Sequence, residues 1–123
     1  MALAQELTAF VRTAVRLPEE RLKRIDREWE RLQPHRAVIT ELVQASPELR
    51  DQARDLREYV LAEARRSADE RAEERLIPED IADAVLPAAR ALLLRRTLKS
   101  SSDPKRAQAF VALTQPFADI LPD

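Results

Sequence analysis

The stretch PEDIADAVLPAARALLLRRTL, residues 78–98, decides how this chain folds. Residues 81–94 include only two strongly polar side chains, Asp83 and Arg90, so a helix formed here is apolar on nearly every side. Such a helix is stable in water only when other helices surround it. The stretch therefore predicts a buried apolar helix at about 78–98, in the middle of a bundle, and Pro87 predicts a kink or a break within it.

The composition favours helices throughout and excludes several kinds of site. The 123 residues include no glycine and no cysteine. Without glycine, the phosphate-binding loops of P-loop and dinucleotide-binding proteins lack the backbone freedom that they need. Without cysteine, disulfides, thiol catalysis and cysteine-ligated metals are excluded. Apolar residues make up 45% and aromatic residues 4%, so a core must be built mainly from Leu, Ile, Val and Ala. We therefore predict an all-α chain that folds as a single helical domain over residues 1–123.

Proline residues mark where the helices begin. Proline has a fixed φ and no N–H, which suits the first position of a helix and disrupts the interior of one. An acid or a capping hydroxyl stands beside most of these prolines, as Ser46 does before Pro47 and Asp103 before Pro104. Together with the spacing of the apolar residues, they predict a mostly antiparallel bundle of five to six helices. The expected ranges are 3–16, 18–32, 34–45, 47–75, 78–98 and 104–120.

The long helix expected at 47–75 changes character halfway along. Its first half has an ordinary stripe of Leu and Val, but residues 62–75 continue that stripe only with alanine, which buries little area. One interpretation is that this half protrudes, stabilised by charge pairs such as Arg66 with Glu70. The other is that a second helix, from this chain or from another copy, approaches closely. A capping-box pattern begins at Ser67, but we expect the helix to continue through it. The candidate self-association face is Ala64, Ala68, Ala72 and Leu76.

The groups that carry chemistry in enzymes are few and scattered. The single histidine, His35, stands at the start of an expected helix beside Pro34, and no hydroxyl lies in a nucleophile motif. The paired Glu-x-x-His motif of di-iron bundles is missing as well. Carboxylates alternate with arginines along polar helix faces, which is typical of a solvated surface. We therefore predict no catalytic, cofactor-binding or metal-binding residues, and a protein that is not an enzyme.

The charge balance and the apolar windows argue against a membrane. With 21 basic and 22 acidic residues the net charge is −1, so bulk charge indicates neither nucleic acid nor an anionic membrane as partner. The most apolar window, 84–94, is about half the ~20 residues that a membrane span needs. The first 15 residues have no basic start, and Glu6 interrupts them, so they do not form a signal peptide. We expect a cytoplasmic protein.

Two segments resemble parts of DNA-binding folds. Residues 38–60 resemble a helix-turn-helix, and the short–long–short order of the third to fifth helices resembles a histone fold, with EDI at 79–81 similar to the start of its last helix. The helix that would enter the DNA groove in a helix-turn-helix exposes acids such as Asp55, which the DNA phosphates repel. In the histone-like segment, Asp80 stands where a histone fold has basic residues that bind phosphate. The histone-like interval is also about one helical turn too short. We therefore interpret residues 75–85 as an ordinary helix-loop-helix corner.

Positive charge gathers between residues 90 and 106, where six basic residues accompany one acid, Asp103. One interpretation is that charges near a helix C-terminus offset the negative end of its dipole. The other is that an anion or an acidic partner binds here. The candidate anion or partner patch is Arg90, Arg95, Arg96, Lys99, Lys105 and Arg106.

These features favour a non-catalytic helical interaction or regulatory module that self-associates as a homodimer or homo-oligomer, or binds another helical protein. A first alternative is a nucleic-acid-associated protein that uses the patch at 90–106. A second is a protein that binds a small apolar ligand between helices beside Pro87. That alternative requires an apolar cavity on the ~300 Å³ scale of small-molecule sites.

Overall fold

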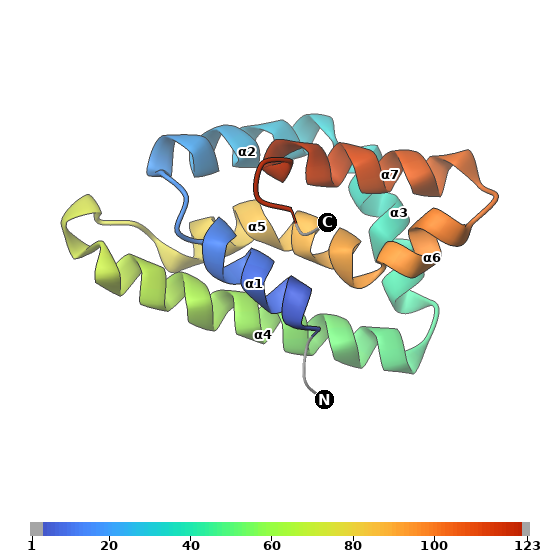
Figure 1. Ribbon diagram of the computed structural model, residues 1–123, viewed down its shortest axis with the longest axis horizontal. Helices are drawn as coiled ribbons and strands as arrows, with labels where there is room; N and C mark the ends of the chain where they lie inside the picture. The colour runs from blue at the N-terminus through green and yellow to red at the C-terminus, as the bar shows by residue number, and fades with distance from the viewer. Residues whose placement is uncertain (1–3, 122–123) are drawn as a thin grey trace.

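A computed structural model of the protein describes residues 4–121, and it confirms an all-α helical bundle (Figure 1). The part of the chain that it describes forms seven α-helices and two short 3₁₀ turns, rather than the five to six helices expected. Residue 3, where the first helix is expected to begin, lies outside the described residues. The elements are α1 (Gln5–Ala14), α2 (Glu19–Arg31), α3 (Gln33–Gln44), α4 (Pro47–Glu70), η1 (Ala72–Glu74), α5 (Pro78–Leu93), α6 (Arg95–Ser100), α7 (Pro104–Thr114) and η2 (Gln115–Phe117).

The apolar helix α5 lies at the centre of the bundle, as residues 78–98 predict. It packs most extensively against α4, and also against α1, α2 and α7 (Figure 1). Every side chain from Ile81 to Ala91 is buried except those of Asp83 and Arg90, the two strongly polar residues. Burial on all sides therefore explains why this segment has so few polar residues.

The expected helix at 78–98 is two helices, and it divides at Leu94 rather than at Pro87. Leu94 leaves the helical conformation with φ −96° and ψ 13°, and α6 begins at the next residue. At Pro87 the helix continues, although proline cannot donate to the carbonyl of Asp83. Beside that carbonyl, the buried indole N–H of Trp29 donates to the carbonyl of Ala84 over 2.8 Å. Trp29 of α2 is therefore hydrogen-bonded to α5 at the turn in which Pro87 removes a backbone hydrogen bond.

The long helix α4 is continuous through Ser67, as expected, but it ends at Glu70 and not at residue 75. The turn η1 follows, and Arg75 then adopts a left-handed conformation with φ 53°. Helices commonly end with such a residue, usually glycine, and arginine takes that place in this glycine-free chain. The last helix also ends early, at Thr114, since Pro116 interrupts it within η2.

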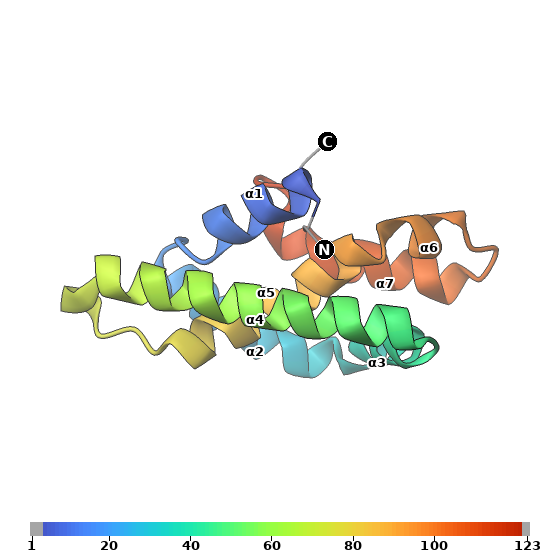
Figure 2. The same cartoon turned by 90° about the horizontal axis from the view of Figure 1, so that it is seen from below.

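The alanine stripe of α4 packs against the chain's own core. Ala64 is fully buried and Ala68 is 9% exposed, within the cluster that α1 and α5 also build. Figure 2 shows α1 above α4 and α5 passing behind it. Ala72 is exposed and Leu76 is partly buried, so only the last residues of the candidate self-association face reach the surface. The close helix contact expected from the alanine stripe therefore exists inside the chain.

No helix within residues 4–121 is both long enough and apolar enough to cross a membrane.

Candidate functional site

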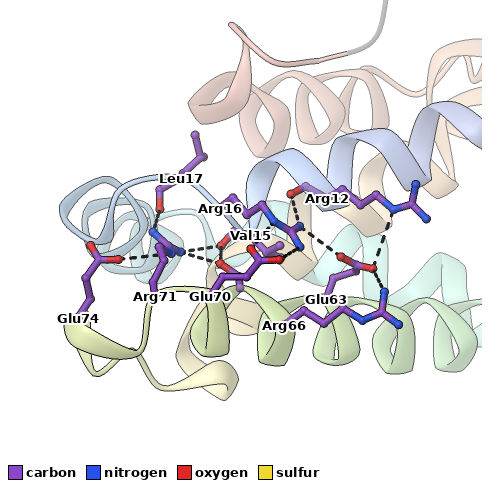
Figure 3. Close-up of polar contacts among 10 residues, drawn as sticks. Arg12, Val15, Arg16, Leu17, Glu63, Arg66, Glu70, Arg71 and Glu74 are labelled. Atoms are coloured by element: carbon purple, nitrogen blue, oxygen red, sulfur yellow. Dashed lines mark hydrogen bonds and ion pairs between the residues drawn. The ribbon is translucent and has the colours of Figure 1, made fainter.

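A cluster of charged residues joins α1 to the second half of α4 (Figure 3). At its centre the carboxylate of Glu63, only 2% exposed, accepts hydrogen bonds from Arg16 (3.3 Å) and Arg66 (2.8 Å), and Arg12 lies 4.0 Å away. Arg16 also donates to both carboxylate oxygens of Glu70, over 2.9 and 3.0 Å. The expected ion pair between Arg66 and Glu70 is therefore replaced by two others: Arg66 pairs with Glu63, and Glu70 pairs with Arg16.

The same cluster caps the end of α1. The last carbonyls of a helix have no partner within it, and basic side chains can satisfy them. Arg71 donates to the carbonyls of Val15 and Leu17 over 2.9 and 2.8 Å (Figure 3). The hydroxyl of Ser67 donates to the same Val15 carbonyl over 2.8 Å. These groups bond to one another across the helix junction, so the cluster's chemistry is that of a structural link.

The six residues of the candidate patch do not share one environment. Arg96, Lys99 and Lys105 are exposed on α6 and at the start of α7, and the ammonium of Lys99 lies 5.0 Å from the ring centre of Phe110. Arg90 instead lines a pocket against α3. The charges that lower the pKa of Arg90, after desolvation by burial, come from Arg36 and Arg57 and not from α6 or α7. Nucleic-acid binding by the exposed members stays a prediction, which a salt titration with a DNA duplex tests.

The pocket beside Pro87 is small and polar. Its volume is about 60 Å³, well below the ~300 Å³ at which sites for small organic ligands begin. The residues that line it include Gln33, Arg36, Thr40 and Arg90. This is not the apolar cavity that the second alternative requires at this place.

A larger pocket lies at one end of the bundle, between α2 and α5. Its volume is about 300 Å³. Leu22 of α2 and Ile81 of α5 are both buried, and they form its apolar floor with the partly buried Leu76. The connection from α4 to α5 closes one side and places Ile77 in the lining, with 56% of its surface exposed. An apolar hollow and a projecting apolar side chain are thus next to each other.

Charges of both signs surround this pocket. Lys23 is paired with Glu19 over 2.9 Å. The pKa of the Asp26 carboxyl is raised, first by desolvation and then by the negative charges of Asp83 and Asp80. The exposed Arg75 also lines the pocket, and it makes no ion pair with any residue of the described chain. The lining therefore combines carboxylates with an arginine that has no ion-pair partner among the described residues.

The single histidine lines neither of these two pockets. His35 is partly buried near the start of α3, where it lines a shallow surface with Val111 of α7. Among residues 4–121, no group of three or more His, Asp or Glu side chains is placed to hold a metal ion.

The chain matches no protein family, no curated protein and no solved structure with which it was compared. A functional proposal therefore rests on the chain's own residues. Two features of the described residues that the fold does not explain are the pocket between α2 and α5 and the unpaired Arg90 beside α3.

Proposed function

We propose that this protein is a non-catalytic, cytoplasmic helical interaction module that self-associates through the surface around Ile77. The observation that carries the proposal is the position of Ile77. An isoleucine with 56% of its surface exposed lines the rim of a pocket whose floor is formed by Leu22, Leu76 and Ile81. Burying such a side chain stabilises a complex by about 1.5–3 kcal/mol.

The surface is complementary to a second copy of itself. In a two-fold symmetric dimer the same patch contacts itself, so a projecting group must lie beside a hollow that receives it. Ile77 and the pocket meet this condition, because Ile77 lines the pocket that the partner's Ile77 would enter. Both halves of the contact are thus on one chain, which favours a second copy over an unrelated protein.

The charges around the pocket support the same arrangement. The exposed Arg75 makes no ion pair within residues 4–121, and the carboxylates of Asp26 and Asp80 line the same pocket. A two-fold axis through the pocket would bring Arg75 of each copy close to these carboxylates of the other. Pairing of this kind fixes the orientation of an interface more than it adds affinity.

The backbone at Arg75 is consistent with a surface that is held in place. A left-handed conformation costs a residue other than glycine about 1–2 kcal/mol, and Arg75 has φ 53°. That conformation directs the chain from η1 into the segment in which Leu76 packs on the core and Ile77 is exposed. The strain is thus stored where the apolar side chain is presented.

The proposal is tested by molar mass from light scattering at several protein concentrations. We expect the wild-type mass to rise with concentration toward that of a dimer, and Ile77→Asp to remain a monomer. Val111→Asp is the matched control, because Val111 is the other large apolar side chain with more than half of its surface exposed in the described chain, at 59%. It should associate like the wild type.

Two results would overturn the proposal. A wild-type protein that is monomeric at all concentrations removes self-association. A protein that dimerises equally well with Ile77→Asp, but not with Val111→Asp, places the interface on α7 instead.

A further inference from the structure

A second feature, independent of self-association, is an arginine that the fold leaves without a partner. Arg90 lies in the central helix α5, between the buried residues Ala89 and Ala91. Its Nε atom is buried and makes no hydrogen bond within the described structure. A buried donor without an acceptor is rare in folded proteins, and it usually indicates a ligand, a water or strain.

The surroundings of Arg90 are positive. Arg36 of α3 lines the same pocket. Desolvation lowers the pKa of Arg90, and the charges of Arg36 and of Arg57 on α4 lower it further. None of these three arginines makes an ion pair with a carboxylate in residues 4–121. Arg36 does act on the carboxyl of Asp26, where its charge partly offsets the causes that raise the pKa of Asp26.

A guanidinium group in a protein cannot relieve this repulsion by losing its proton. Two guanidinium groups from facing helices, those of Arg36 and Arg90, line one pocket, and the exposed Arg57 adds a further positive charge that acts on Arg90. An anion bound between Arg36 and Arg90 would reduce the repulsion between them. Guanidinium groups bind planar or tetrahedral oxyanions through paired N–H donors, which makes arginine the preferred residue for such sites.

The size of the pocket limits the ligand. A volume of about 60 Å³ holds a few waters or one compact anion, and it excludes sugars and bases. The charge is equally informative, since a phosphate group carries about −1.5 to −2 at neutral pH and a carboxylate only −1. A pocket lined by two arginines and by no carboxylate matches the more highly charged group.

We propose that the pocket formed by Arg90 and Arg36, with Arg57 nearby, binds a single phosphate group, either free phosphate or the phosphoryl group of a small monoester. Arg90 of α5 and Arg36 of the facing helix α3 each supply a guanidinium group to the pocket. The side-chain amide of Gln33 adds a polar donor at the pocket wall. The hydroxyl of Thr40 already donates to the carbonyl of Arg36 over 3.1 Å, so it holds the α3 backbone rather than the ligand.

The test is isothermal titration of the full chain with inorganic phosphate, at constant ionic strength set with chloride. We expect saturable binding at one site per chain. Arg90→Gln and Arg36→Gln should each raise the dissociation constant by about tenfold or more, which corresponds to ~1.4 kcal/mol. Arg96→Gln is the matched control, because Arg96 is an exposed arginine on the neighbouring helix, and it should bind phosphate like the wild type.

Further arms identify the ligand. Phosphoserine in place of inorganic phosphate tests a monoester, and binding of either one supports the proposal. Acetate tests a carboxylate, and acetate binding as tight as that of phosphate overturns the assignment. The absence of saturable phosphate binding overturns it too, as does unchanged binding by Arg90→Gln.

A stability measurement separates a binding role from a structural one. Without phosphate, Arg90→Met should raise the midpoint of urea unfolding, because it removes an unpaired charge while keeping the apolar stem. In saturating phosphate the order should reverse, since ligand stabilises only the protein that binds it. If Arg90→Met lowers the midpoint equally in both conditions, Arg90 is structural and the proposal fails.

Discussion

Three arginines with the same chemistry have three different roles, set by what stands opposite each guanidinium. Arg71 donates to backbone carbonyls at the end of α1, and Arg16 donates to the carboxylates of Glu63 and Glu70. Arg90 faces other arginines. The first two have ion-pair partners within the described residues, since the buried Nε of Arg71, which makes no hydrogen bond, lies 3.5 Å from Glu74, whereas Arg90 has none. A residue's partners, and not its type, distinguish the structural link from the candidate anion site.

Arg71→Ala tests the structural role at this scale. The change leaves the carbonyl of Leu17 without its donor and that of Val15 with Ser67 alone, at about 1–3 kcal/mol for an unsatisfied group. We expect the free energy of unfolding, measured in urea, to fall by that amount. Arg65→Ala, at an exposed position of α4, should change it by less than ~0.5 kcal/mol. Equal effects of the two changes would contradict the capping role.

Which residues form the sites was only partly predictable. Arg90 is conspicuous in the sequence because the helix around it is otherwise apolar. Arg36 and Arg57 are distant in sequence and look like ordinary surface residues, so only the packing of α3 and α4 around α5 brings them near Arg90. Glu63 had a usable signal: it lies three residues from Val60 and four from Ser67, on the buried stripe of α4.

At the scale of whole elements, helix starts were predictable, and so were the ends expected at residues 32 and 45, which lie within one residue of the ends of α2 and α3. Pro47, Pro78 and Pro104 each occupy the start of a helix as expected, and the side chains of Ser46 and Asp103 cap two of them. The ends expected at residues 75, 98 and 120 were wrong, because helix ends are usually marked by glycine and this chain has none. The C-caps use other residues, which carry no comparable signal.

The buried alanine stripe gives a prediction about the contact between helices. Ala64 is fully buried, so Ala64→Leu forces three additional carbons into a packed junction, at about 1–3 kcal/mol. We expect a matching decrease in the free energy of unfolding. Ala72→Leu places the same side chain on the exposed turn η1 and should be close to neutral. If Ala64→Leu is neutral as well, α4 does not pack on its neighbours as described.

The ion pairs between elements give the stability a pH dependence. The hydrogen bond from Arg16 lowers the pKa of Glu70, and that from Arg21 lowers the pKa of Asp119. A lowered folded-state pKa means that the stabilisation is present above the ordinary values, 4.5 and 3.8, and is lost as the pH falls through the lower folded-state values. The raised pKa of Asp26 opposes this trend, because protonation there removes an unfavourable charge.

We therefore expect the free energy of unfolding to fall as the pH drops below about 4.5. Arg16→Gln removes the pairing of Glu70, so its stability should depend less steeply on pH in this range. Urea unfolding at a series of pH values measures both slopes. Parallel slopes for the wild type and the variant would show that the Arg16–Glu70 pair does not contribute.

At the scale of the molecule, the two candidate sites use different parts of one scaffold. The helix α5 carries both, with Asp80 and Ile81 at the pocket near its start and Arg90 near its end. The long helix α4 extends along one side of the bundle, and its far end leads into the segment that presents Ile77 (Figure 1). The apolar centre could be predicted from the sequence. The pocket beside Ile77 could not, because it depends on where α4 ends.

The absence of cysteine makes a direct measurement of the central claim possible. In the proposed dimer Ile77 enters a pocket that its counterpart lines, so the two copies of residue 77 lie close together. A single cysteine introduced as Ile77→Cys should form an intermolecular disulfide rapidly under mild oxidation, whereas Val111→Cys, equally exposed, should form one only slowly. Equal rates of disulfide formation at the two positions would contradict self-association through Ile77.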